Sequence, residues 1–191
     1  MNDKLIAVLE RYGSFSPTEK VLIKDRLNIV VLKPGEIFIK KDIVVDKIGF
    51  LVSGILRNYS VNSCGKEITV NFSSENEFIT VINSFCYGRL TTGAVHAETK
   101  CTLLYLDRDD CDFLKENIED WLNAMVLLAG EYLLEINIFM RVLINEDAKN
   151  SYLIFLENYP EVAKKVSLGH IASFLGITQS TLSRIRKQLV S

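Results

Sequence analysis

The chain has 191 residues, of which 48% are hydrophobic and 24% charged, and its formal net charge is −2. This length and apolar content are sufficient to bury a core, which excludes an intrinsically disordered chain. No apolar run approaches the roughly 20 residues that a membrane-spanning helix needs, and the first residues, MNDKLIAVLERYG, lack the pattern of a signal peptide. We therefore expect a cytoplasmic protein with no membrane partner.

Residues 3–27 predict one or two helices. Apolar residues recur on one helix face from Leu5 to Tyr12, and Ser16–Glu19 (SPTE) is a start signal for a second helix. The pattern then changes to short β-type runs separated by turn residues such as Pro34-Gly35. The runs are 28–32, 37–39, 48–52, 55–60, 68–72, 94–97 and 102–106. Many short strands with glycine turns predict an antiparallel sandwich or barrel.

Cysteine and histidine are sparse. No CxxC pair occurs, and the cysteines are Cys64, Cys86, Cys101 and Cys111. Only His96 and His170 are available to join them in a metal site, so we expect buried thiols, no metal and no cofactor. His96 stands in a predicted strand, where a hydrogen-bonded sheet residue is the commoner role.

Past Asp109 the pattern is that of a long helix with an apolar residue at every third or fourth position. Its seam residues are Leu122, Met125, Ala129, Tyr132, Ile136, Phe139 and Leu143. Three heptads of this kind predict pairing with a second copy in a homodimer, while packing along the chain's own barrel is the alternative. A shorter helix containing Tyr152 and Leu156 follows and ends before Pro160.

The segment Ser167–Leu189 (SLGHIASFLGITQSTLSRIRKQL) predicts a helix-turn-helix. Its apolar residues have helical spacing on both sides of Gly176, which suits the end of the first helix, and Ser167 and Thr178 stand where hydroxyls cap helices. The outer face of the second helix would carry Ser180, Ser183, Arg184 and Lys187. A plain helical hairpin with one polar face is the alternative.

Charge is unevenly divided along the chain. From Val162 onward there are five basic residues and no Asp or Glu, which gives this part a charge of +5. Since the whole chain has a net charge of −2, residues 1–161 have a net charge of −7. The basic residues are Lys164, Lys165, Arg184, Arg186 and Lys187. A local basic region on an acidic body favours a phosphate-rich partner.

The order of these parts resembles the Crp/Fnr family of bacterial transcription regulators. The segments that carry the resemblance are 33–37 (KPGEI), 49–57 (GFLVSGILR), 65–67 (GKE), 171–178 (IASFLGIT) and 182–186 (LSRIR). The resemblance implies an α+β chain with an N-terminal jelly roll of cyclic-nucleotide-binding type in residues 1–117. A dimerisation helix in residues 118–145 and a DNA-binding helix-turn-helix in residues 146–191 would follow.

For DNA, the resemblance implies that Gln179, Ser180 and Arg184 face base edges. Thr178, Ser183 and Lys187 would be better placed for phosphates. An arginine side chain can bond O6 and N7 of one guanine together, which makes Arg184 the strongest candidate for base recognition. No β-hairpin wing is evident between Pro160 and Ser167, so we expect minor wing contacts. RNA polymerase is the further partner that the resemblance implies.

The sensory segment departs from relatives that bind cyclic AMP. Where those have a Gly-Glu pair and an Arg-Ser or Arg-Thr pair, this chain has Thr80-Val81 and Thr91-Thr92. A buried phosphate without a cation costs several kcal/mol, so we expect no regulation by cyclic AMP unless Arg89 substitutes. The expected effector pocket consists of Ile79, Thr80, Val81, Phe85, Arg89, Thr91, Thr92 and Tyr132. An unidentified small-molecule effector and a purely structural barrel both stay open.

Other cofactors and functions are less well supported. No cysteine precedes Cys64 to hold an iron–sulfur cluster, and His96 alone does not provide a set of haem ligands. A metal-dependent jelly-roll enzyme needs two or three histidines with a carboxylate inside the barrel, and the strand region supplies one. We therefore expect no enzyme. The remaining alternative is a ligand-binding barrel whose helical tail contacts protein.

Overall fold

The computed structural model describes residues 1–190, and for Ile138, Val142 and Val190 it describes the backbone alone. In these residues the strands are β1 (Asn28–Leu32), β2 (Ile37–Ile39), β3 (Lys47–Ser53), β4 (Leu56–Val61), β5 (Glu67–Ser73), β6 (Phe78–Ile79), β7 (Gly93–Ala97) and β8 (Cys101–Asp107). The helices are α1 (Asn2–Leu9), α2 (Pro17–Arg26), α3 (Ile82–Tyr87), α4 (Arg108–Asn117), α5 (Trp121–Asn145), α6 (Ala148–Asn158), α7 (Pro160–Lys165), α8 (Leu168–Phe174) and α9 (Gln179–Val190).

The strands form two four-stranded antiparallel sheets. Their orders are β1-β8-β3-β6 and β2-β7-β4-β5. The apolar inner faces of both sheets meet in a core that includes Leu51, Leu56 and Leu103. The expected α+β fold with an antiparallel jelly roll is therefore confirmed.

Each predicted strand is present, with bounds that differ from the prediction by at most one residue. The sequence analysis missed β6 and α3, since segments of two and six residues are too short to show a periodic pattern. At Gly54 the backbone has φ of 105°, and a Cβ there would lie 2.6 Å from Cys101 Sγ. The turn between β3 and β4 therefore requires glycine.

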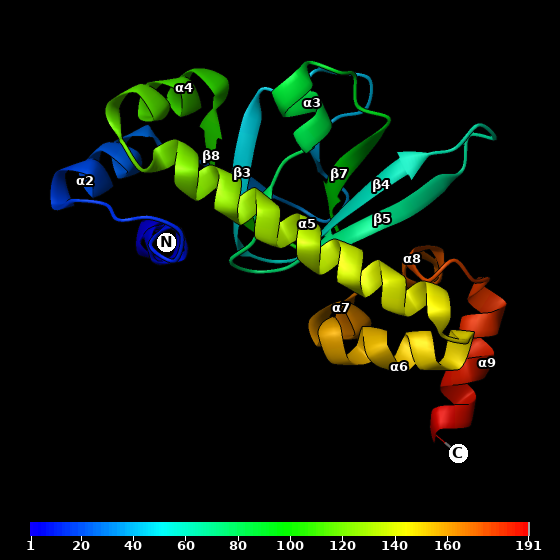
Figure 1. The fold of residues 1–191 in the computed structure, drawn as a ribbon. Coiled ribbons are helices and arrows are strands. Elements are labelled where there is room, and N and C mark those ends of the chain that lie inside the picture. Colours follow the sequence, from blue (N-terminus) through cyan, green and yellow to red (C-terminus); the bar gives the residue numbers. More distant parts are fainter. Residues whose placement is uncertain (191) are drawn as a thin grey trace.

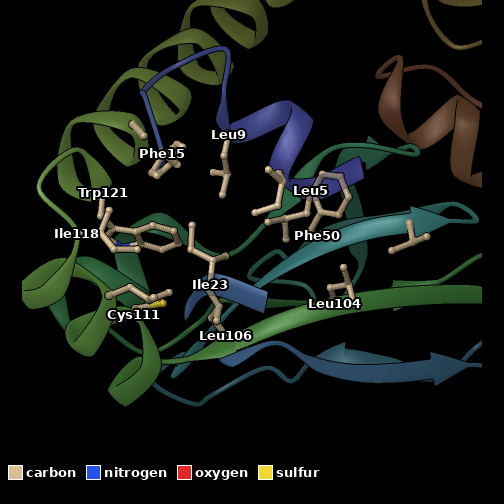
Figure 2. Packing of buried hydrophobic residues seen from close by; sticks show 14 residues of the cluster. Leu5, Leu9, Phe15, Ile23, Phe50, Leu104, Leu106, Cys111, Ile118 and Trp121 are labelled. Carbon is tan, nitrogen blue, oxygen red and sulfur yellow. The ribbon is translucent and has the colours of Figure 1, made fainter. Parts of the chain in front are cut away.

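The N-terminal helices complete a second core on the outside of the first sheet. Figure 2 shows Leu5 of α1 beside Phe50 of β3 and Leu9 of α1 pointing into the same core, which also contains Trp121 of α5. Helix α2 begins with a capping box in which Ser16 and Glu19 each bond the other's backbone N–H. This core fixes α1, α2, α4 and the start of α5 to the sheet.

Helix α5 connects the two ends of the molecule. In Figure 1 it runs across the jelly roll from α4 to the C-terminal helices, and its 25 residues span about 37 Å. There it meets a group of packed rings, the junction aromatic cluster: Phe72, Phe139, Phe155, Tyr159 and Phe174. Helices α6 and α8 thus pack against Phe72 of β5, and α5 packs on α8 through Phe139.

The prediction of four buried thiols is wrong for two of them. Cys101 and Cys111 are buried, and burial raises the pKa of Cys111 to about 12. Cys64 is exposed in the β4–β5 turn, and Cys86 is exposed on α3. Cys64 has only polar residues and glycine around it in the sequence (NSCGK), and Cys86 lies near the end of the six-residue helix α3.

Among residues 1–190, none of the helices has the length and apolar content needed to cross a membrane.

We expect Leu9→Ala to lower the free energy of unfolding by about 2–5 kcal/mol, because Leu9 is 0% exposed in the outer core and its loss leaves a cavity. The control is Leu90→Ala, whose exposed side chain should contribute within about 0.5 kcal/mol. Urea unfolding measures both. Equal small effects would mean that α1 is not part of the cooperative fold.

Candidate functional site

The helix-turn-helix is built as its capping residues predict. Ser167 accepts a hydrogen bond from the backbone N–H of His170 at the start of α8, and Thr178 accepts one from Thr181 at the start of α9. Between the helices Gly176 has φ of 68°, a conformation that favours glycine. These contacts fix the angle at which α9 leaves α8.

Helix α9 is anchored by its apolar side. Leu182 and Ile185 are buried in a core that also contains Phe155, Phe174 and Ala172. Because α-helical residues i, i+3, i+4 and i+7 share a face, the polar residues between these anchors project away from that core. Figure 1 shows α9 at the opposite end of the molecule from α2 and α4.

All six residues predicted to contact DNA lie on or directly before α9. Thr178, Gln179, Ser180, Arg184 and Lys187 are exposed, and Ser183 is half-buried. The Thr178 hydroxyl also lies 2.9 Å from those of Ser180 and Thr181, so it serves as the cap of the helix. The structure brings the six residues together, and their role in binding DNA stays a prediction.

The basic residues of this region differ in their surroundings. Lys164 and Lys165 pair with Glu161 at 2.9 and 2.8 Å, and hydrogen bonds from the two ammonium groups lower the pKa of Glu161 to about 2. Among the described residues no ion pair joins Arg184, Arg186 or Lys187 to a carboxylate. The positive charge available to a partner is therefore concentrated on α9.

A cavity of about 870 Å³ lies between the jelly roll and α5. Of the expected effector-pocket residues, Ile79, Thr80, Phe85 and Tyr132 line it. The other four do not: Val81 packs into the barrel core, Arg89 and Thr92 are exposed, and Thr91 is buried. The Thr91 hydroxyl donates to Lys40 O and accepts from the Ile43 backbone N–H, so it stabilises a loop and is unavailable to a ligand.

The charged lining of this cavity is mostly acidic. Its carboxylates are Glu77, Asp112, Glu131 and Glu135, and its cations are Arg11 and Lys115. Arg11 pairs with Glu131 at 3.4 Å. Burial raises the pKa of Glu77 to about 7, with a smaller contribution in the same direction from Glu135, while a backbone hydrogen bond from Ser74 opposes it. An anionic ligand bound here would face these carboxyl groups. The guanidinium in the lining, that of Arg11, is already paired with Glu131.

Polar groups deep in the cavity form a short hydrogen-bonded chain that the sequence did not indicate. The Asn71 amide donates to the Tyr132 hydroxyl at 3.2 Å, and the Tyr159 hydroxyl donates to Asn71 Oδ1 at 3.4 Å. Burial raises the pKa of both tyrosines. This chain joins a cavity residue of α5 to a ring of the junction aromatic cluster.

The predicted dimer seam faces largely into the chain itself. Met125 packs on the outer core, and Leu122 is exposed. Ala129, Tyr132 and Ile136 line the cavity. Phe139 and Leu143 pack on the C-terminal core. One residue further along, α5 presents an exposed apolar row: Val126 (61% exposed), Leu133 (55%), Met140 (38%) and Ile144 (76%). Apolar residues occur on both sides of the helix, so the heptad pattern fits both the predicted seam and the row one residue further along. The sequence alone does not distinguish these two registers.

Comparisons with known proteins give the same architecture. Residues 29–117 match the family model of the cyclic nucleotide-binding domain. FixK2 from Bradyrhizobium japonicum is 18% identical, with 85% of this chain and 84% of that one covered and a TM-score of 0.74. A putative regulator of the Crp/Fnr family from Eubacterium rectale is 17% identical, covering 91% and 83% with a TM-score of 0.70.

A third similar structure is CLP from Xanthomonas campestris, described as a c-di-GMP responsive global regulator. It is 14% identical, 91% of each chain is covered, and the TM-score is 0.70. A search of curated proteins found no match. At these identities the likeness establishes the fold, and it confirms the resemblance expected from the sequence.

Glu77 should make stability depend on pH. Its pKa of about 7 in the folded chain exceeds that of an unfolded glutamate, so the folded state binds more protons and stability falls as pH rises from about 4.5 to 7. Over this pH range, the free energy of unfolding of Glu77→Gln should fall by about 1–3 kcal/mol less than that of the parent chain. Urea unfolding at several pH values measures it, with the exposed Glu75→Gln as control. An unchanged pH profile in Glu77→Gln would contradict the raised pKa.

Proposed function

Because residues 29–117 match the family model of the cyclic nucleotide-binding domain and the chain is similar in fold to Crp/Fnr regulators, we propose that it is a transcription regulator that binds specific DNA sequences as a homodimer. The observation that carries this proposal is the outer face of α9, where Arg184 and Lys187 are exposed and no described carboxylate pairs with them. Two of the similar structures, the Eubacterium rectale protein and CLP, are described as regulators, which supports a non-enzymatic function.

The arrangement of α9 supports recognition of the major groove. A helix fits that groove, and residues in its first two turns reach base edges. Gln179, Ser180 and Arg184 occupy those turns, while α8 packs behind them against the junction aromatic cluster. Arg184 would bond O6 and N7 of a guanine, Gln179 would favour adenine, and Thr178, Ser183 and Lys187 would contact phosphates.

The exposed apolar row of α5 supports dimerisation. Val126, Leu133 and Met140 recur every seven residues, and Gly130, Asn137 and Ile144 recur every seven between them. This alternation of three and four residues is the spacing of a two-stranded coiled coil. We propose this row, in place of the seam predicted from the sequence, as the contact with a second copy, with the inward-facing seam holding each α5 to its own jelly roll.

A two-fold dimer would place two copies of α9 in successive major grooves. Their target would be a pseudo-palindromic sequence with half-sites about 34–36 Å apart. RNA polymerase is a further partner proposed on the likeness to transcription regulators.

The cavity supports regulation by a small molecule other than cyclic AMP. The positions at which cyclic-AMP-binding relatives hold the phosphate would be Thr91 and Thr92 here, and Thr91 is committed to backbone hydrogen bonds. The Glu135 carboxylate in the lining would also repel a cyclic phosphate.

Substitution of Arg184 should separate base recognition from phosphate attraction. Arg184→Ala should weaken binding to a selected site by about 1–3 kcal/mol and leave binding to random DNA nearly unchanged. Lys187→Ala should weaken both to the same degree and lower the salt dependence. Fluorescence anisotropy over a range of salt concentrations measures these effects, with the exposed Lys149→Ala as control. If Arg184→Ala weakened both DNAs equally, the base contact would be rejected.

Substitution of Leu133 should test the dimer contact. Leu133→Glu places a charge in the middle of the exposed row and should give monomers at concentrations where the unmodified chain is dimeric. The matched control is Leu90→Glu, an exposed leucine outside α5. Sedimentation equilibrium measures the mass of both variants. Dimers that persist in Leu133→Glu would show that another surface pairs.

A further inference from the structure

Three ligand-type side chains from distant parts of the chain converge where the jelly roll meets α8. His96 lies on β7, Glu98 follows that strand, and His170 lies in the first turn of α8. We call these three residues the histidine–glutamate cluster. The two histidines are the only ones in the chain, and 74 positions separate them in the sequence.

The ligand atoms of the three side chains lie close together. One carboxylate oxygen, Glu98 Oε1, lies 2.8 Å from His96 Nε2 and 2.7 Å from His170 Nδ1. All three atoms lie within 4.8 Å of one another. In a tetrahedral metal site with bonds of about 2.0–2.1 Å, ligand atoms lie about 3.3 Å apart. Small rotations of these side chains would therefore open room for an ion.

The hydrogen bonding of the cluster is incomplete. His170 Nδ1 is buried and, despite its short distance to Glu98, it has no hydrogen bond of acceptable geometry. A buried ring nitrogen without a well-oriented hydrogen bond costs free energy, and a metal ion would use its lone pair. The side chain of Glu98 is 8% exposed, whereas that of His170 is 35% exposed, so an ion can enter from the α8 side.

We propose that His96, Glu98 and His170 bind a divalent transition-metal ion such as Zn²⁺, which links the jelly roll to the first helix of the helix-turn-helix. Two imidazole nitrogens and one carboxylate oxygen are ligands that Zn²⁺ and Co²⁺ accept, and water would complete a tetrahedral site.

The nearest fixed cation does not prevent this. The buried Arg57 side chain is held by neighbours other than the cluster, because its Nη1 donates to Glu67 at 2.8 Å and its Nε donates to Thr69 at 2.8 Å. The Glu67 carboxylate therefore offsets the charge of Arg57, and the Glu98 carboxylate stays available to the ion.

Metal binding would strengthen a contact that holds α8 in place. Helix α8 lies next to β5 in Figure 1, and the backbone N–H of Thr69 on β5 donates a hydrogen bond to Ser173 Oγ on α8 at 3.0 Å. The ion would add bonds between β7 and α8 at this junction. Any effect on DNA binding rests on the proposed function, whereas metal binding itself does not.

The test is a Co²⁺ titration of the untagged 191-residue chain carrying Cys64→Ser and Cys86→Ser, which removes the exposed thiols. We expect one ion per chain with visible absorption bands, displaced by Zn²⁺. His96→Gln, Glu98→Gln and His170→Gln should each weaken binding about tenfold or more, while Glu161→Gln, an exposed carboxylate outside the cluster, should not. Absence of saturable binding, or equal binding in the three cluster variants, would overturn the proposal.

Thermal unfolding provides a second readout for any variant that is less stable. Zn²⁺ should raise the Tm of the parent chain and of Glu161→Gln and leave that of Glu98→Gln unchanged. In a separate experiment, Zn²⁺ should change the affinity for selected DNA in the parent chain and not in Glu98→Gln. Metal binding without this second effect would reject the link to DNA and retain the site.

Discussion

The position of the helix-turn-helix depends above all on the packing of aromatic rings around Phe72 of β5. Phe72 of β5 meets Phe155 and Phe174 with ring centroids 6.3 and 5.5 Å apart, and Phe174 stacks on Phe139 of α5 at 5.8 Å. Large aromatic side chains bury 150–250 Å² each, so this group contributes a large share of the apolar contact between the jelly roll and the C-terminal helices. With Leu182 and Ile185 buried in the same core, the polar face of α9 has to point outward.

The same cluster connects the cavity to the core that holds α8 and α9. Tyr132 and Phe139 are seven residues apart on α5, so they lie on one face, and the first lines the cavity while the second stacks on Phe174. The hydrogen-bonded chain through Asn71 and Tyr159 follows the same route. A ligand that displaced Tyr132 or Asn71 would therefore change the surroundings of rings that hold α8. This gives the proposed regulation a physical basis in a shift of α5 and its neighbours.

Local sequence patterns predicted most of the fold because turns, strand alternation and helix caps depend on residues that are close in the sequence. Turn glycines and alternating runs located the longer strands, and Ser167, Gly176 and Thr178 located the helix-turn-helix by the chemistry of caps. The side of α5 that packs on the chain's own core could not be predicted from the sequence, because both sides of that helix are apolar and only the barrel decides which side is buried. Only half of the residues expected in an effector pocket line the cavity, because a loop residue such as Thr91 can turn inward to bond backbone. The histidine–glutamate cluster forms only once α8 is placed against the sheet.

The central claim is that two copies of α9, held outward by this packing, recognise one DNA duplex together. The most direct measurement is the selection of bound sequences from a pool of random duplex DNA by the full-length chain. The account predicts enrichment of an inverted repeat whose half-site centres lie about one helical turn, or 34–36 Å, apart. A pool that stays random after selection, or that yields a single half-site without symmetry, would contradict it.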